Sequence, residues 1–133
     1  MTNEWKKVLA THEERQELSR GPWLGDEFAG VALPSQSAYG KWIILRFGDL
    51  WTCAQVADVG PWCRDDDLYV YGQARPRAEL MKGQFVPLEL RDPSKHNGLI
   101  SNGAGIDLFP RVARELGIAI NSNQKVEWKF AEP

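Results

Sequence analysis

The sequence predicts one β-rich domain, and three observations carry this prediction. The chain has 133 residues, the length of a single domain with a modest core. An apolar run over residues 41–47 (KWIILRF), the turn signal Gly48-Asp49 and a second apolar run over residues 50–59 (LWTCAQVADV) follow one another in the order of a β-hairpin. Near the end of the chain, apolar and polar residues alternate over residues 125–130 (KVEWKF), which predicts a last strand with one face against the core.

Composition and charge narrow the class of protein. Hydrophobic residues make up 43% and charged residues 26% of the chain, as in ordinary globular proteins. With a formal net charge of −2, the chain lacks the excess of Lys and Arg that is typical of nucleic-acid-binding proteins, so we expect no nucleic-acid partner. No apolar run approaches the roughly 20 residues of a membrane-spanning helix, and the first residues hold no apolar signal-peptide core. We therefore expect no membrane span and synthesis in the cytosol.

The N-terminal residues 1–21 have the spacing of a helix. Residues that can share one helical face recur at Trp5, Val8, Leu9 and His12. Gly21-Pro22 is a helix stop. The sequence thus predicts an N-terminal helical extension over residues 1–25 and a main domain over residues 26–133.

The stretch VADVGPW at residues 56–62 places an acid at the end of a strand. Gly60 supplies a backbone shape that other residues resist, and Pro61 fixes φ and lacks an N–H, so the strand ends here. Asp58 is therefore held on the last rigid residues before a turn, with Trp62 just beyond it. This arrangement suits two roles. Asp58 accepts hydrogen bonds from the N–H groups of its own turn, or it handles a sugar beside an exposed indole.

A second acid, Asp107, lies between a predicted short strand and a short helix. In residues 101–120 (SNGAGIDLFPRVARELGIAI), Pro110 stands at the preferred first position of a helix, and Gly117 is a helix stop. Asp107 can simply favour the dipole of that helix. Each half of the chain thus runs strand, acid and tight glycine turn.

The connection between these stretches carries no metal or nucleotide pattern. The acidic triplet at residues 65–67 lacks the alternating ligands and glycine of a calcium loop, so we expect a solvated cluster. Residues 85–90 (FVPLEL) predict a strand with an edge or a break at the proline. Two cysteines and two distant histidines do not form a ligand cluster, and we expect neither a metal nor another cofactor. Cys53 and Cys63 either form a disulfide across the turn in an oxidising compartment or stay free thiols.

Taken together, these motifs resemble those of a known fold. GVALPSQSAYGKWIIL, VADVGPW, NGAGIDLFPRVARELGI and KVEWKF follow one another as in a six-stranded double-psi β-barrel, over roughly residues 28–130 with an insertion at about residues 64–100. The sequence is similar to rare-lipoprotein-A-like bacterial cell-wall proteins. It more distantly resembles expansins, barwin-like proteins, family 45 glycoside hydrolases and the barrel of membrane-bound lytic transglycosylase A. The DxGP and GxxID-L motifs are specific as a pair and weak singly.

The resemblance implies a groove across the barrel that both acids line. Asp58 matches the aspartate of DxGP, which in the rare-lipoprotein-A-like group is thought to serve catalysis, and Asp107 resembles the catalytic aspartate position of the transglycosylase barrel. The residues expected to bind the sugar are Trp62, Tyr69, Tyr71 and Asn102. The resemblance thus implies a peptidoglycan-cleaving protein, a lytic transglycosylase or a hydrolase. Asp107 would protonate the glycosidic oxygen, and Asp58 would act as second acid or position the substrate.

Two residues depart from the family pattern. The rare-lipoprotein-A-like group has a histidine shortly before its Leu-Pro, where this chain has Gly30, and Phe109 replaces the serine or threonine that caps the short helix. Asp26, Glu27 or an acid of residues 65–67 would have to replace the histidine. The departure favours a second hypothesis, an expansin-like module that binds polysaccharide or peptidoglycan without cutting it. A third hypothesis is a structural β-barrel with a protein partner.

A cell-wall ligand also constrains where the protein acts. Because no signal peptide is visible, we expect the periplasm or wall to be reached through phage lysis, through an injection machine, or with a leader not present in this sequence. A disulfide between Cys53 and Cys63 would indicate a compartment outside the cytosol.

Overall fold

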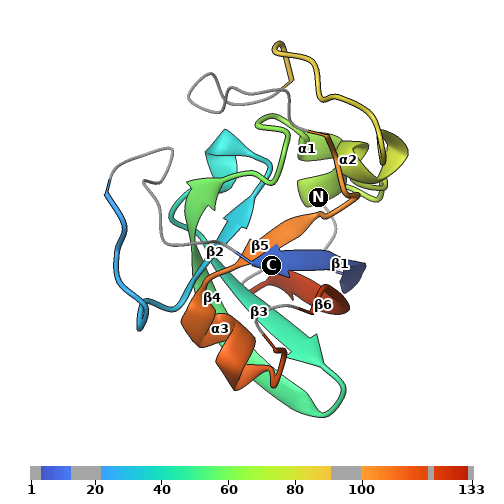
Figure 1. Cartoon of the computed structure of the whole chain (residues 1–133). Coiled ribbons are helices and arrows are strands. Elements are labelled where there is room, and N and C mark those ends of the chain that lie inside the picture. The colour runs from blue at the N-terminus through green and yellow to red at the C-terminus, as the bar shows by residue number, and fades with distance from the viewer. Residues whose placement is uncertain (1–3, 13–21, 91–99, 120–121, 132–133) are drawn as a thin grey trace.

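Six strands close into a barrel in the computed structural model, which describes residues 4–12, 22–90, 100–119 and 122–131 (Figure 1). The strands are β1 (Lys6–His12), β2 (Gly30–Leu33), β3 (Trp42–Phe47), β4 (Leu50–Val59), β5 (Ile106–Leu108) and β6 (Gln124–Phe130). The helical elements are η1 (Gln36–Ala38), α1 (Asp67–Val70), α2 (Arg77–Leu80) and α3 (Pro110–Glu115). Around the barrel the strands follow the order β1-β5-β2-β4-β3-β6. The prediction of a mainly β protein with a six-stranded barrel is confirmed.

Strands β3 and β4 form the predicted hairpin. Their register runs from Trp42 opposite Gln55 to Phe47 opposite Leu50. Gly48 turns the chain with a φ of +58°, in the left-handed region where a Cβ is unfavourable. β6, predicted from its alternation, pairs with β3 on one side and with β1 on the other, and so closes the barrel.

The pairing of the strands is the same in the two halves of the chain. β1 runs parallel to β5, and β2 runs parallel to β4. The other four pairs, β2–β5, β3–β6, β3–β4 and β1–β6, are antiparallel. Exchanging β1 with β4, β2 with β5 and β3 with β6 leaves every pair and its direction unchanged. Each half therefore contributes three strands in equivalent positions.

The prediction of an N-terminal helix is wrong for the residues described there, because Lys6–His12 form strand β1. Val8 and Ala10 are buried while their immediate neighbours are not, which is the two-residue period of a strand. The main chain pairs with β5 on one side and β6 on the other, and these long-range hydrogen bonds outweigh the local spacing. β1 is thus a barrel strand and not part of an extension. The remaining predicted helix, residues 13–21, lies outside the described residues.

Two aromatic residues from elements far apart in the sequence pack against each other in the interior of the barrel. α1 carries Tyr69 against Trp128 of β6, with the ring centroids 6.0 Å apart and the planes at 87°. The Tyr69 hydroxyl accepts a hydrogen bond from Trp128 Nε1 at 2.8 Å and donates one to the Gly105 carbonyl at 2.9 Å. With their polar atoms satisfied, both rings lie in the core, 1% and 0% exposed.

Between β4 and β5 the chain forms α1 and α2, and the strand predicted at residues 85–90 is wrong. Within that stretch Phe85 makes a single bridge to Ile100, and the residues from Leu88 onward form a turn. Pro87 lies between these two parts, and its missing N–H prevents a continued ladder.

The acidic triplet before α1 is not the uniformly solvated cluster that the sequence predicts. Asp65 is exposed, but Asp66 is only 2% exposed. Burial raises the pKa of the Asp66 carboxyl, and Arg77 opposes the rise through a main-chain hydrogen bond at 2.7 Å and a guanidinium nitrogen 3.8 Å away. Asp66 therefore joins the start of α1 to the start of α2.

Candidate functional site

Both predicted catalytic acids lie in one row across four neighbouring strands. Thr11 of β1 pairs with Asp107 of β5, and Asp107 pairs in turn with Ala32 of β2. Ala32 also pairs with Asp58 of β4. Paired residues point to the same face of a sheet, so these four side chains, the acid row, share one face. Val31, which precedes Ala32, belongs to the core cluster, so the row lies on the outer face of the barrel.

A register shift in the β2–β4 pairing brings Asp58 into the acid row. Val31 pairs with Val56, but the next residue, Ala32, pairs with Asp58. Ala57 is therefore an extra residue on β4, as in a β-bulge. Without this shift Ala57 would stand opposite Ala32, and the acid would lie one position farther along the strand.

The two acids of the row differ in exposure. Asp58 is 0% exposed, whereas Asp107 is half-buried. Thr11 Oγ1 donates a hydrogen bond to Asp107 Oδ1. Because β2 lies between β4 and β5, the backbones of the two acids are about 10 Å apart at standard strand spacing. Of the two, Asp107 is the acid that a ligand on the surface can contact.

Trp62 and Asn102, both predicted to bind sugar, are joined by a hydrogen bond. Trp62 Nε1 donates to Asn102 Oδ1 at 3.1 Å, and the same oxygen accepts the Ala104 N–H at 3.0 Å. Trp62 has a φ of +68°, a left-handed conformation that residues other than glycine rarely adopt. The half-buried indole after β4 is thus tied to the segment that leads into β5.

The two predicted sugar-binding tyrosines lie outside the acid row. Tyr69 is part of the core, and burial raises the pKa of its hydroxyl above the ordinary value. Tyr71 is half-buried and stacks on Phe130, with centroids 5.3 Å apart and planes at 15°. Its hydroxyl accepts a hydrogen bond from Ser37 Oγ at 3.0 Å. Both rings therefore pack against the residues of the barrel itself.

An apolar cluster fills the place where the family resemblance expects a histidine. The cluster comprises Trp23, Phe28, Ala57 and Phe109. A Cβ built on Gly30 would lie 2.7 Å from the Phe109 ring and 2.9 Å from the Phe28 ring, closer than real contacts. Phe109 is fully buried, and its ring centroid is 5.1 Å from that of Trp23. The two departures from the family pattern, at Gly30 and Phe109, are thus in direct contact.

The acids considered as replacements for that histidine have partners outside the acid row. Asp26 accepts a hydrogen bond from Trp23 Nε1 at 3.2 Å, and Glu27 forms an ion pair with Arg114 at 2.7 Å. In the triplet, Asp65 accepts a hydrogen bond from Gln36 Nε2 at 2.8 Å, and Asp67 accepts one from Ser35 Oγ at 2.7 Å.

Both cysteines are free thiols in this structure. Cys53 is exposed on β4, whereas Cys63 is 2% exposed. Burial, reinforced by the nearby Asp66 carboxylate, raises the pKa of the Cys63 thiol to about 11.

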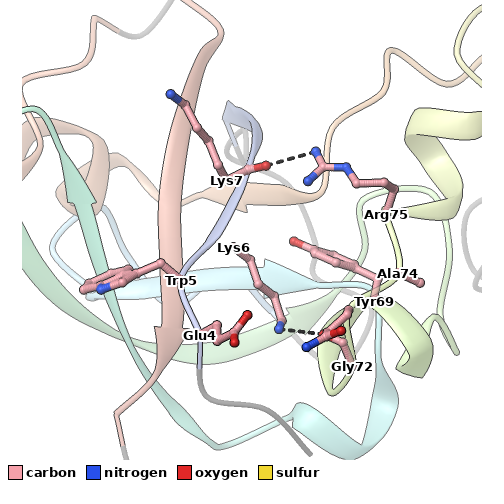
Figure 2. A pocket seen from close by; sticks show the side chains of 9 residues that line it. Glu4, Trp5, Lys6, Lys7, Tyr69, Gly72, Ala74 and Arg75 are labelled. Atoms are coloured by element: carbon pink, nitrogen blue, oxygen red, sulfur yellow. Dashed lines mark hydrogen bonds between the residues drawn. The ribbon is translucent and has the colours of Figure 1, made fainter.

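Two features near the start of β1 were missed because those residues were assigned to a helix. One is a cluster in which the Arg46 guanidinium lies 4.0 Å from the Trp5 ring centroid and 5.5 Å from that of Trp51. The same guanidinium forms an ion pair with Glu127 at 3.1 Å. The other is a hollow of about 320 Å³ whose wall includes Lys6 (Figure 2). No local sequence signal could have found either feature, since Trp5, Val8 and Leu9 fit one face of a helix as well as a strand.

Among the described residues, His, Cys, Asp and Glu side chains nowhere gather in groups of three or more that could hold a metal ion. In the same parts of the chain, no helix has the length and apolarity needed to cross a membrane.

Comparison with known proteins supports the fold. No protein-family model matches the chain, and no curated protein matches its sequence. Among the solved structures that match, Streptomyces papain inhibitor superposes with a TM-score of 0.51 and 11% sequence identity. The match covers 96% of this chain and 94% of the inhibitor. At this identity the likeness extends to the barrel fold and not to function.

Proposed function

We propose that this chain is a double-psi β-barrel protein that binds a cell-wall glycan on the acid row without cleaving it. The double-psi class is supported by the order of the sequence motifs, by the two parallel pairs β1–β5 and β2–β4, and by the equivalence of the two halves. The glycan as ligand class rests on the resemblance to cell-wall proteins. The geometry of the acid row bears on whether the protein cuts or only binds.

The observation that carries this proposal is the burial of Asp58. A glycosidase of the usual kind needs two carboxyl groups at the scissile bond, one on each side. Asp58 has no exposed surface, and β2 separates it from Asp107. A glycan chain lying on the row therefore meets one carboxyl group, that of Asp107.

The apolar cluster supports the same conclusion. The resemblance places a histidine beside the acids, and here Gly30 leaves that position to the Phe109 ring. Phe109, Phe28 and Trp23 offer neither a proton donor nor an acceptor from their ring carbons to a reacting sugar. The surroundings of the row are thus those of a binding surface rather than of an acid–base pair.

The row and the Trp62 indole can each hold a sugar, in complementary ways. The Asp107 carboxylate and the Thr11 hydroxyl oxygen, whose one proton is already donated to Asp107, both accept hydrogen bonds from sugar hydroxyls. Trp62 presents an amphipathic ring whose nitrogen is fixed by Asn102, so the apolar side of a sugar ring can pack on it. Fixing the indole before binding lowers the entropy cost of that contact.

The test is co-sedimentation with purified peptidoglycan, combined with mass spectrometry of the soluble products. We expect the protein to pellet with the sacculi and to release no muropeptides. Asp107→Ala and Trp62→Ala should each weaken pelleting roughly tenfold, as expected when a charged hydrogen bond or a buried aromatic contact is lost. Asp49→Ala, at an exposed acid in the β3–β4 turn, is the matched control and should pellet like the wild type.

Three results would contradict the proposal. Anhydro-muropeptides that vanish in Asp107→Ala would identify a lytic transglycosylase, and products with ordinary reducing ends would identify a hydrolase. Absence of both pelleting and products would remove the glycan as ligand.

A protein partner is the second candidate. The structural neighbour is named as an inhibitor of papain, and Trp42 and Trp51 are exposed here by 51% and 56%. Trp51 lies beside Arg46, and tryptophan and arginine are enriched among the residues that dominate protein interfaces. Under this candidate the protein slows the hydrolysis of a chromogenic peptide by papain, and Trp51→Ala relieves the inhibition. Unchanged papain activity at a hundredfold excess of the protein would reject papain as the partner.

A further inference from the structure

We infer that the hollow at the start of β1 binds a small molecule through its carboxylate, with Lys6 as the anchoring cation. The hollow has a volume of about 320 Å³, and Glu4, Trp5, Lys6, Lys7, Tyr69 and Arg75 are among the residues that line it. Along β1, Lys6 precedes Thr11 by five residues, about 16 Å of strand. The site is therefore distinct from the acid row and does not rest on the proposed glycan function.

Lys6 is held in a defined position at the wall of the hollow. Its partner across the β1–β6 ladder is Trp128, and its Nζ lies 5.7 Å from the centroid of that ring. Nζ donates a hydrogen bond to the Gly72 carbonyl at 2.9 Å (Figure 2). An ammonium group has three donors, and the Gly72 carbonyl takes one of them. The remaining donors are what an anionic group in the hollow would meet.

The charges around the hollow favour an anion. Lys6, Lys7 and Arg75 are cationic, and Glu4 is the acid among the lining residues, although the whole chain has a net charge of −2. Burial lowers the pKa of the Lys6 ammonium, and the neighbouring Glu4 carboxylate opposes that effect. A partly desolvated ammonium gains most from a counter-charge that arrives with a ligand.

Arg75 lines the hollow with its side chain held in place, and it does not serve as a second cation for the ligand. Its guanidinium forms an ion pair with Glu79 at 2.7 Å. It also donates a hydrogen bond to the Lys7 carbonyl at 3.0 Å (Figure 2). These bonds compensate its charge and tie the segment after α1 to β1. Lys6 is therefore the cation whose loss should matter most for an anionic ligand.

The shape of the hollow is also set before any ligand binds. Tyr69 is held by two hydrogen bonds, to Gly105 and Trp128, and is buried in the core. A volume near 320 Å³ is at the small end of ligand sites, so the occupant is about the size of one sugar ring or a dipeptide. Two kinds of ligand, a peptide C-terminus and an acidic sugar, both carry a single carboxylate on a compact molecule.

The experiment is a titration of the ¹⁵N-labelled full chain, followed by amide chemical shifts. The probes are N-acetyl-glycyl-alanine and glucuronate, and their neutral counterparts are the dipeptide amide and glucose. We expect saturable shifts at Lys6 and Gly72 with one or both carboxylates, and none with the neutral counterparts. The peptide acid and the acidic sugar then distinguish the two sources of the carboxylate.

Three variants sharpen the test. Lys6→Met keeps the length of the stem and should weaken binding roughly tenfold or more, the loss expected for one charge-assisted hydrogen bond. Glu4→Gln removes the opposing charge and should tighten binding several-fold. Lys41→Met, at an exposed lysine outside the hollow, is the matched control and should bind like the wild type.

The inference is overturned by equal shifts with the neutral probes, by no shifts with either carboxylate, or by unchanged affinity in Lys6→Met. If Lys6→Met fails to fold, Glu4→Gln decides, and unchanged carboxylate affinity in that variant overturns the inference. None of these outcomes depends on pelleting with peptidoglycan, so this site and the proposed function can fail separately.

Discussion

Gly30 lies directly against the ring of Phe109, so close that a Cβ at position 30 would come within 2.7 Å of it. The main chains of the two residues are also joined, since the Phe109 N–H donates to the Gly30 carbonyl at 3.1 Å. A histidine at position 30 and a large ring at position 109 therefore exclude each other. The two positions at which the sequence departs from the resemblance thus meet in one packing contact.

This contact predicts a strong coupling between the two positions. Gly30→Ala should lower the free energy of unfolding by about 1–3 kcal/mol, because the added methyl group overpacks the cluster. Phe109→Ala alone should cost about 3–5 kcal/mol through the loss of a buried ring. In the Phe109→Ala background the cost of Gly30→Ala should fall by at least about 1 kcal/mol, as urea unfolding of all four proteins would show. If the unfolding free-energy losses of the two single variants added up to that of the double variant within about 0.5 kcal/mol, the coupling would be contradicted.

Asp58 is predicted to matter for stability, and Asp107 for ligand binding. Asp58 is 0% exposed, and buried carboxylates persist in proteins because their surroundings compensate them. Asp58→Ala should therefore lower the free energy of unfolding by about 1–3 kcal/mol. Asp107→Ala, which loses the hydrogen bond from Thr11 at a half-exposed site, should cost about 1 kcal/mol or less.

Urea unfolding of the two variants checks this prediction, with Asp49→Ala in the exposed turn as the control expected within about 0.5 kcal/mol of wild type. A larger loss for Asp107→Ala than for Asp58→Ala would contradict the assignment of the two acids.

The elements that the sequence predicts well are those defined by local patterns. The β3–β4 hairpin has a turn signal between two apolar runs, and β6 alternates cleanly. β1 could not be predicted in the same way, because Trp5, Val8 and Leu9 fit one face of a helix as well as a strand. What decides between them is pairing with β5 and β6, about a hundred residues away in the chain.

The site was predictable only in part for a similar reason. The two acids could be identified because each stands next to a chain reversal. Their different burial could not, and neither could the register shift at Ala57 that brings Asp58 opposite Ala32. Nor does the local sequence show that α1 turns Tyr69 into the barrel, where Trp128 and Gly105 complete its hydrogen bonds.

The two thiols are predicted to react at very different rates. Cys53 is exposed, whereas Cys63 is buried with a pKa of about 11, so at pH 8 only about 0.1% of Cys63 is thiolate. Ellman's reagent should therefore titrate one thiol per chain in the native protein and two in guanidinium chloride. Cys53→Ser should abolish the fast reaction, and Cys63→Ser should leave it intact. Two fast thiols would contradict the burial of Cys63, and none after denaturation would reveal a disulfide.

Glu115 at the end of α3 is predicted to make stability depend on pH. Its carboxylate accepts hydrogen bonds from Thr52 Oγ1 and Arg111 Nε, each at 2.6 Å, and these hold the pKa of Glu115 below the ordinary value of 4.5. Because the folded-state pKa is the lower one, this stabilisation is present above the unfolded pKa and is lost as the pH falls through the folded pKa. Its size should stay below about 1 kcal/mol, since the Arg111 and Glu115 side chains are 47% and 38% exposed.

Urea unfolding of the wild type and Glu115→Gln at pH 7 and pH 3 tests this dependence. We expect the variant to be less stable at pH 7, where only the wild type carries the charged acceptor, and the difference to shrink as the pH falls towards 3 and Glu115 takes up its proton. Glu89→Gln, at an exposed acid in the turn over residues 88–90, should stay within about 0.5 kcal/mol of wild type at both pH values. A difference for Glu115→Gln that is unchanged between pH 7 and pH 3 would show that the contact with Thr52 and Arg111 does not depend on the charge of Glu115.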